Sequence, residues 1–136
     1  MDPDPKKFAE LPVDHELGVP VPFACSSARE IDPRRVPQCA LSRVCGICGA
    51  GLGRPIAFIG SADEAARNAF HFPPAHVECA EALLTAYAEV DAAVLGQPDP
   101  LAEWTLVTTA GFEYVRAGRE QIDRRPTFQP NSLLPS

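Results

Sequence analysis

The sequence predicts an α+β fold in which short strands and one main helix surround a cluster of metal-binding side chains. Two pairs of such residues, Cys45/Cys48 and His76/Cys79, are separated by 27 residues. Strand-like and helix-like apolar patterns occupy residues 44–115, whereas seven of the 15 prolines fall within the first 38 residues. The patterned region has only about 70 residues, and domains of this size often need a metal ion or disulfides for stability.

The chain divides into three predicted parts. Residues 1–24 form a proline-rich extended arm, and its apolar run VPVPF at residues 19–23 suits a buried edge segment or a partner-binding strand. Residues 25–116 form the α+β domain, in which Asp32 and Pro33 resemble a helix start. Pro37 would interrupt that helix, so at most a short turn is expected. Residues 117–136 form an extended or disordered tail, anchored if at all by Phe128, Leu133 and Leu134.

The first cysteine pair lies in a glycine-rich loop, CGICGAGLG. Glycines tolerate the unusual backbone angles of such a loop, and its free N–H groups can bond sulfur. The apolar residues 55–59 then predict a short strand. Ser61 and Glu64 form a capping box, which predicts a short helix over residues 62–69, followed by an extended stretch at residues 70–72.

The longest helix is expected over residues 75–95, with Gly96 and Pro98 as its stop signals. Apolar residues at three- and four-residue spacing define one buried face; they are Val77, Ala80, Leu83, Leu84, Tyr87, Val90 and Val94. Residues 104–115 are rich in strand-forming residues, with a turn at Ala110 and Gly111, and therefore predict a C-terminal β-hairpin.

The two pairs together predict a closed tetrahedral zinc site with Cys45, Cys48, His76 and Cys79 as ligands. Thiolates and imidazole are the donors that structural Zn²⁺ prefers, and a Cys-x-x-Cys turn can present two sulfurs to one ion. His76 and Cys79 lie three apart at the start of the expected helix, so they face the same side of its first turn. A cysteine loop followed by a hairpin and a ligand-bearing helix is a treble-clef-like arrangement.

Two enzymatic interpretations of the same residues fit less well. A thioredoxin-like redox pair would open a helix, whereas Cys45-x-x-Cys48 runs into GAGLGRP, which cannot be helical. His76-x-Glu78 resembles the H-x-E motif of zinc deaminases. Cys79, however, would fill the fourth coordination position and leave no room for a catalytic water.

The remaining candidate residues leave some alternatives open. An HNH-type nuclease would use the same scaffold, but Asn68 and His71 lack the required D-H…N order. His71 is an alternative to the helix histidine, but its extended stretch favours a surface or packed residue. Cys25 and Cys39 are expected to be small buried residues or free thiols, with Cys39 as an alternative ligand beside Cys45. No catalytic constellation is recognised, so the chain is expected not to be an enzyme.

Charge is unevenly distributed along this acidic chain. The net charge of −6 argues against a general nucleic-acid binder. No Lys or Arg occurs between Arg67 and Arg116, where seven acids lie: Glu78, Glu81, Glu89, Asp91, Asp99, Glu103 and Glu113. Arginines gather instead before and after this stretch. The pattern indicates either an ordinary solvated surface or an acidic helix face opposite a basic edge that suits a partner of matching polarity.

The two metal-binding motifs are similar to those of a known group of proteins. CGICGAGLGRPIAFIG followed by PPAHVECAEAL resembles a group of small, uncharacterised zinc-binding proteins of actinobacteria and their bacteriophages, whose shared pattern runs C-x-x-C-G…H-x-x-C-A. The similarity covers roughly residues 45–83. It implies that Cys45, Cys48, His76 and Cys79 are zinc ligands, and it implies little about function.

These observations predict a non-enzymatic protein in which one structural Zn²⁺ stabilises a small module that binds a protein partner. The partner would contact residues 19–23, the acidic helix face or the tail. One alternative is a nucleic-acid-binding regulatory protein that uses an edge of four arginines: Arg34, Arg35, Arg43 and Arg54. Another is a thiol and zinc redox sensor. The sequence has no membrane-length apolar stretch and no signal peptide, which predicts a cytoplasmic protein with reduced thiols.

Overall fold

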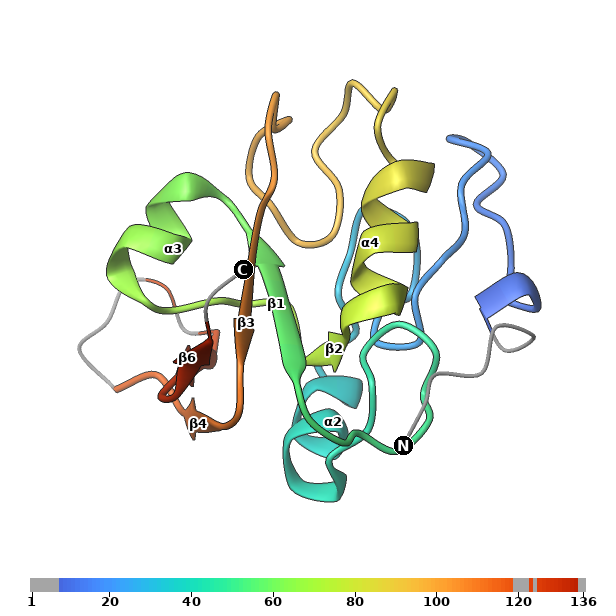
Figure 1. Ribbon diagram of the computed structural model, residues 1–136. Helices are drawn as coiled ribbons and strands as arrows, with labels where there is room; N and C mark the ends of the chain where they lie inside the picture. Colours follow the sequence, from blue (N-terminus) through green and yellow to red (C-terminus); the bar gives the residue numbers. More distant parts are fainter. Residues whose placement is uncertain (1–7, 119–122, 124, 135–136) are drawn as a thin grey trace.

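The computed structural model describes residues 8–118, 123 and 125–134 of the chain (Figure 1). Its helices and strands follow in the order α2 (Arg35–Ser42), β1 (Ile56–Gly60), α3 (Ala62–Arg67), β2 (Ala75–His76), α4 (Val77–Ala86), β3 (Thr105–Thr109), β4 (Phe112–Val115), β5 (Thr127–Pro130) and β6 (Leu133–Leu134). Strands and helices are mixed and the strands pair antiparallel, so the predicted α+β class is confirmed.

Strand β1 lies at the centre of the fold. It pairs with β2 on one side and with β3 on the other, in a four-stranded sheet of order β2-β1-β3-β6. All five of its residues are buried, because both faces of the strand are covered. Ala57 and Ile59 belong to one apolar cluster together with α4, whereas Ile56 and Phe58 belong to another together with α2 and several phenylalanines. Figure 1 shows α4 and α3 on opposite sides of this strand.

Aromatic rings fill the second cluster. Phe58 lies 5.7 Å from Phe70, 5.6 Å from Phe112 and 5.9 Å from Phe128, measured between ring centroids. Phe128 comes from the segment that was expected to be an extended or disordered tail. In the structure this segment forms β5 and β6, and Phe128 is completely buried. The described part of the segment is thus extended, and Phe128 anchors it in the second cluster.

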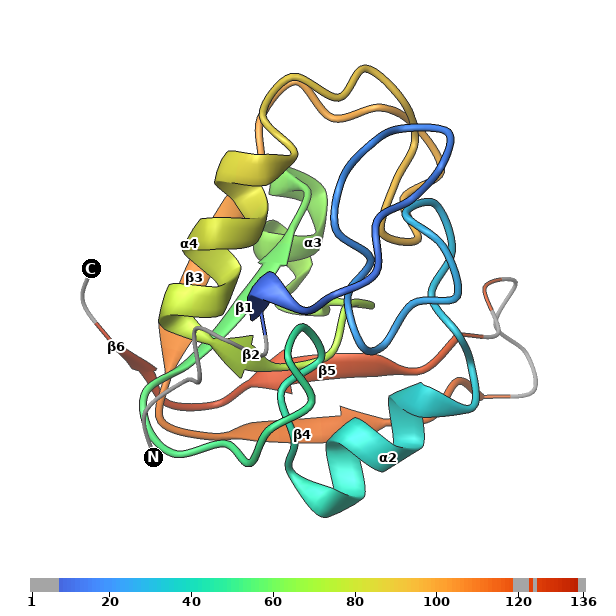
Figure 2. The same cartoon turned by 90° about the vertical axis from the view of Figure 1, so that its right-hand side faces the viewer.

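The predicted C-terminal hairpin is wrong in its pairing. Strands β3 and β4 and the bend between them exist, but β3 pairs with β1 and β6, while β4 pairs only with β5 in a separate sheet. Figure 2 shows the β4–β5 pair crossing below β1 and α4. The buried Thr109 hydroxyl stabilises the bend, because it donates to the Gly111 carbonyl at 2.7 Å and accepts from the Ser132 N–H at 3.1 Å.

The main helix is shorter than the predicted range of residues 75–95. Helix α4 ends at Ala86, and Tyr87 is no longer helical. The apolar pattern continues to Val94 and Leu95, but these residues reach the core from an irregular segment. That segment is held by hydrogen bonds from the Leu95 N–H to the Ala28 carbonyl and from the Gly96 N–H to the Arg29 carbonyl. Leu95 and Gly96 both have positive φ angles, which a continuous helix does not allow.

Helix α2 is longer than the short turn expected around Pro37. The helix begins at Arg35, so Pro37 is its third residue. The first four N–H groups of a helix have no partner within it, so a proline in the first turn costs no hydrogen bond. The capping box of α3 is confirmed: the Ser61 hydroxyl accepts from the Glu64 N–H, and the Glu64 carboxylate accepts from the Ser61 N–H.

The end of the predicted N-terminal arm is part of the core. Val19 and Val21 are buried, and the N–H groups of Phe23 and Ala24 donate to the carbonyls of Ile47 and Gly46 at 2.9 Å. Of the two uses weighed for residues 19–23, the buried segment is correct. The first seven residues of the arm, and residues 119–122, 124, 135 and 136 of the expected tail, lie outside the described residues. Among the helices that the structure describes, none has the length and apolarity of a membrane span.

Candidate metal centre

Four side chains meet beside β1, and they are the four predicted ligands. The sulfurs of Cys45, Cys48 and Cys79 and a ring nitrogen of His76 all lie within 4.8 Å of one another, and all four residues are buried. Cys45 and Cys48 come from the loop between α2 and β1, His76 ends β2, and Cys79 lies in the first turn of α4. Two segments that are distant in the sequence therefore meet at one cluster.

The loop is shaped so that backbone N–H groups point at the first sulfur. The Cys45 sulfur accepts hydrogen bonds from the N–H groups of Ile47 at 3.3 Å, Cys48 at 3.4 Å and His76 at 3.4 Å. The turn closes with a bond from the Gly49 N–H to the Cys45 carbonyl, and Gly49 has a φ of 79°, which favours glycine. These donors stabilise negative charge on the sulfur, as expected for a metal-bound thiolate.

The His76 ring is held in the orientation that a metal ligand needs. Its Nε2 lies 2.9 Å from the Gly51 carbonyl oxygen, and because a carbonyl only accepts, Nε2 must carry the proton. The lone pair of Nδ1 then faces the sulfurs of Cys48 at 3.4 Å and Cys79 at 3.7 Å. A carbonyl that fixes the tautomer of a histidine ligand is a common feature of metal sites.

Burial and hydrogen bonds shift the pKa values of the Cys45 and Cys79 thiols in opposite directions. Burial raises the pKa of the Cys45 thiol, but hydrogen bonds from the Cys48 and Cys79 thiols and from backbone N–H groups outweigh it, so the pKa is lowered overall. The hydrogen bonds of the Cys79 thiol to the Cys45 and Cys48 sulfurs raise its pKa, and burial raises it further. Three thiolates this close would repel one another, and a positive ion between them would offset that repulsion.

The donor set can hold a metal ion in a closed site. Three sulfurs and one nitrogen fill four tetrahedral positions, and every ligand is buried. An ion in this cluster would have no open position for water or substrate among these ligands, which is the arrangement of a structural site rather than a catalytic one.

The two other cysteines lie outside this cluster. Cys25 and Cys39 are buried free thiols, and burial raises the pKa of each to about 12. Thiols with such pKa values are neutral and unreactive near pH 7. The group of metal-binding atoms in the described chain includes neither of them, so the first pair needs no substitute ligand from Cys39.

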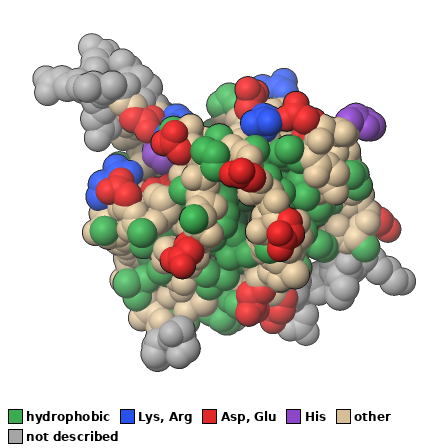
Figure 3. All heavy atoms as spheres, turned by 90° about the horizontal axis from the view of Figure 1, so that it is seen from above, with side chains coloured by type: hydrophobic (Ala, Val, Ile, Leu, Met, Phe, Trp, Pro, Cys, Tyr) green, Lys and Arg blue, Asp and Glu red, His purple; other side chains and the backbone are tan. Residues whose placement is uncertain are grey.

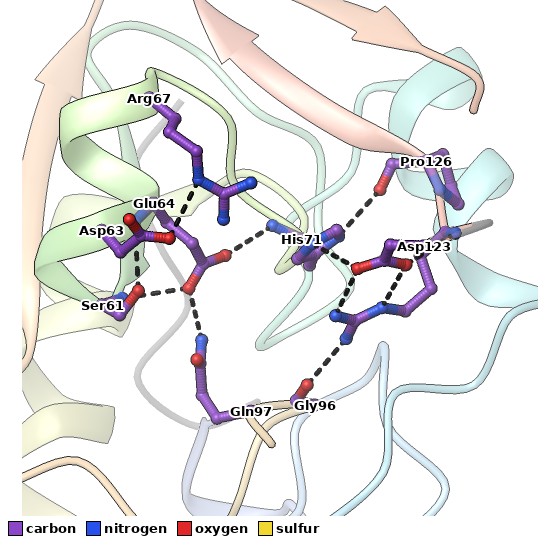
Figure 4. A network of polar contacts seen from close by, with 10 residues as sticks. Ser61, Asp63, Glu64, Arg67, His71, Gly96, Gln97, Asp123 and Pro126 are labelled. Atoms are coloured by element: carbon purple, nitrogen blue, oxygen red, sulfur yellow. Dashed lines mark hydrogen bonds and ion pairs between the residues drawn. The ribbon is translucent and has the colours of Figure 1, made fainter. Parts of the chain in front are cut away.

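His71 also belongs to a different group of residues. Its Nδ1 lies 3.1 Å from the Pro126 carbonyl and its Nε2 lies 3.4 Å from the Asp123 carboxylate. The backbone N–H of His71 donates to the carboxylate of Glu64. This carboxylate lies at the centre of the polar network in Figure 4. The sequence pattern predicted Glu64 only as a capping residue. The network could not be predicted from it, because His71, Gln97 and Asp123 lie far from one another along the chain.

Two of the four arginines of the predicted basic edge share a pocket, because Arg43 and Arg54 both line it. The other two have local contacts. Arg34 is paired with Asp32 at 3.1 Å, and the Arg35 guanidinium lies 4.3 Å above the Phe23 ring.

Comparisons of this chain with protein-family models, with curated proteins and with solved structures gave no match. The resemblance of the two motifs to actinobacterial and bacteriophage proteins therefore stays a prediction. The metal centre rests on its own geometry.

Proposed function

We propose that this is a non-enzymatic zinc-binding protein, in which one structural zinc ion stabilises a small module that binds a protein partner. The observation that carries the proposal is the buried group of three cysteine sulfurs and one imidazole nitrogen within 4.8 Å. Zn²⁺ is the ion whose preferred structural donors are these ligands in this number.

The zinc ion would connect the loop between α2 and β1 to the start of α4, in the manner of a treble clef. Both segments contribute to the first apolar cluster, which contains Ile47, Ala80 and Leu83. Unfolded chains rarely contain a preformed site, so the free energy of metal binding contributes directly to folding. A thiolate-based site of this kind suits a reducing compartment, and we place the protein in the cytoplasm.

The proposed partner surface is the acidic end of the molecule, beyond α4. Figure 3 shows acidic side chains spread among apolar ones on this face, with the basic ones toward its edges. Exposed acids of α4 and the following loops are Glu78, Glu81, Glu89, Asp91, Asp99 and Glu103. A partner with basic residues would complement this charge. Residues 19–23 are less suitable, because Val19 and Val21 are buried.

Metal content tests the zinc centre. We expect one zinc per chain in freshly purified protein, measured by elemental analysis, and loss of both zinc and the folded circular dichroism spectrum in Cys79→Ser. Cys39→Ala is the matched control, since Cys39 is buried but lies outside the cluster, and it should keep its zinc. A wild-type protein that folds without metal, and is unchanged by a chelator, would contradict the proposal.

Charge reversal tests the partner surface. Immobilised wild-type protein should retain a partner that the double variant Glu89→Lys, Asp91→Lys does not retain, because the basic partner would then meet like charge. The variant Asp63→Lys is the control, since Asp63 is an exposed acid on α3. Equal retention by all three proteins would exclude the acidic end as the contact surface.

A further inference from the structure

A second site lies where the end of α2, the loop before β1 and the bend between β3 and β4 meet. It is an open pocket of about 520 Å³. Its lining includes Arg43 and Arg54 together with Gly111, Phe112, Asn131 and Ser132. It shares no residue with the cysteine cluster, and nothing in the proposed function uses it.

The charge of this pocket is opposite to that of the whole protein. Two of its lining residues are arginines and none is Asp or Glu, although the chain has a net charge of −6. Within the described ranges, Arg29, Arg34, Arg67 and Arg125 each form an ion pair with a carboxylate. Arg43 and Arg54 have no such partner among these residues. Two arginines without a counter-charge in the described ranges therefore line one pocket, which favours an anion there.

Several contacts fix the shape of the site in advance. The Arg43 guanidinium lies 5.1 Å from the centre of the Phe112 ring, a cation–π contact that limits its freedom. The two sides of the loop are joined by a bond from the Leu52 N–H to the Arg43 carbonyl at 2.9 Å. The Thr109 hydroxyl accepts from the N–H groups of Gly111 and Ser132 and so fixes the position of these two lining residues.

Asn131 adds a neutral donor to the two charged ones. Its Oδ1 accepts a hydrogen bond from the Ser132 hydroxyl at 3.3 Å. Its side-chain NH₂ group has no acceptor in the described part of the chain. An arginine pair and an amide donor match the several oxygens of a phosphate group, since guanidinium groups bind phosphate through paired hydrogen bonds.

We propose that this pocket binds a small phosphate-bearing ligand of the size of a nucleoside diphosphate. Its volume lies within the range typical of small-molecule sites, about 300–1,000 Å³. A nucleic-acid backbone is a poorer occupant, because it needs a continuous basic track, and Arg34 and Arg35 are engaged with Asp32 and Phe23. This inference goes beyond the proposed function, because it uses neither the metal centre nor the acidic end.

Isothermal titration of the zinc-loaded protein at low salt tests the proposal, with ADP, pyrophosphate and a single-stranded oligonucleotide as separate probes. Asn131→Asp keeps the shape of the side chain but places a negative charge in the pocket, and it should abolish binding of ADP and pyrophosphate. Arg54→Gln should weaken ADP binding about tenfold, because it removes one charge-assisted contact. Arg67→Gln is the matched control, since it removes the same charge from α3, and it should bind as the wild type does.

Saturable binding of ADP or pyrophosphate that is lost in Asn131→Asp and kept in Arg67→Gln supports the proposal. Binding of the oligonucleotide alone overturns it in favour of a nucleic-acid backbone. Binding that weakens equally in Arg54→Gln and Arg67→Gln overturns it too, because it would report only net charge. The absence of binding by all three probes also overturns it.

Discussion

At the scale of single residues, Glu64 shows how one buried carboxylate organises several segments. It accepts hydrogen bonds from the Ser61 N–H at 3.0 Å, the His71 N–H at 3.0 Å and the Gln97 side chain at 2.5 Å. Gly60 leaves the space for it, since a Cβ at that position would lie 2.7 Å from the Glu64 Oε1 atom. One side chain therefore links the start of α3 to the segments that follow α3 and α4 (Figure 4).

Glu64→Gln should lower the free energy of unfolding by about 1–3 kcal/mol. The amide replaces an acceptor oxygen by a donor, so at least one buried N–H group that now bonds Glu64 loses its acceptor. Urea unfolding of the zinc-loaded protein measures the effect. Asp63→Asn is the control, because Asp63 is exposed and pairs with Arg67 on the same helix, and surface pairs contribute about 0–1 kcal/mol. Equal stability of Glu64→Gln and the wild type would contradict the role given to this carboxylate.

At the scale of elements, the segment before α2 is attached through Asp14. Its carboxylate accepts from the N–H groups of Ala28, Leu17 and Glu16, each at 2.9 Å. The hydrogen bond from Ala28, together with those from Leu17 and Glu16, holds the pKa of this carboxyl below its ordinary value of 3.8. The folded state therefore favours the ionised form.

This attachment gives a prediction with a definite sign in pH. A carboxyl with a lowered pKa in the folded state stabilises the protein above the pKa of the unfolded chain, and this contribution is lost as the pH falls through the folded pKa. Asp14→Asn should therefore reduce stability at pH 7, and its stability should fall less than that of the wild type when the pH drops below 3.8. Urea midpoints of both proteins, measured from pH 7 downward on either side of this value, give the difference. The zinc content of both is determined at each pH, because protonation of the ligands releases the metal, and only samples of equal zinc content are compared. Asp91→Asn removes one charge from an exposed loop and controls for net charge.

Local signals in the sequence predicted the elements that depend on neighbouring residues. Ser61 and Glu64 predicted the start of α3, the apolar residues 55–59 predicted β1 within one residue, and the cysteine and histidine spacing predicted the members of the metal cluster. The early end of α4 could not be predicted, because it depends on the bonds of Leu95 and Gly96 with residues 28 and 29. The predicted pairing of β3 with β4 was wrong for the same reason. Both strands have the local pattern of a hairpin, but the pairing of β3 with β1 depends on residues far away in the sequence.

At the scale of the whole molecule, two apolar clusters share β1 but differ in what holds them. The first contains Cys45, Cys48 and Cys79 together with residues of α4, so an ion held by the four Cys and His side chains would connect its segments. The second contains no metal ligand and depends on aromatic rings from four separate parts of the chain: Phe58, Phe70, Phe112 and Phe128. The last of these rings comes from β5, so the C-terminal segment completes the fold.

Phe128→Ala should lower the free energy of unfolding by about 3–5 kcal/mol. The ring is fully buried and contacts Phe58, Phe112 and Tyr114 at centroid distances of 5.9, 5.7 and 5.2 Å. Leu133→Ala is the control from the same segment, because Leu133 is 61% exposed and should change stability by no more than about 0.5 kcal/mol. Urea unfolding should show this contrast while both variants keep their zinc, since neither change touches a ligand. If Phe128→Ala were as stable as Leu133→Ala, the C-terminal segment would only cover the surface, and the second cluster would have to be held by the other three rings alone.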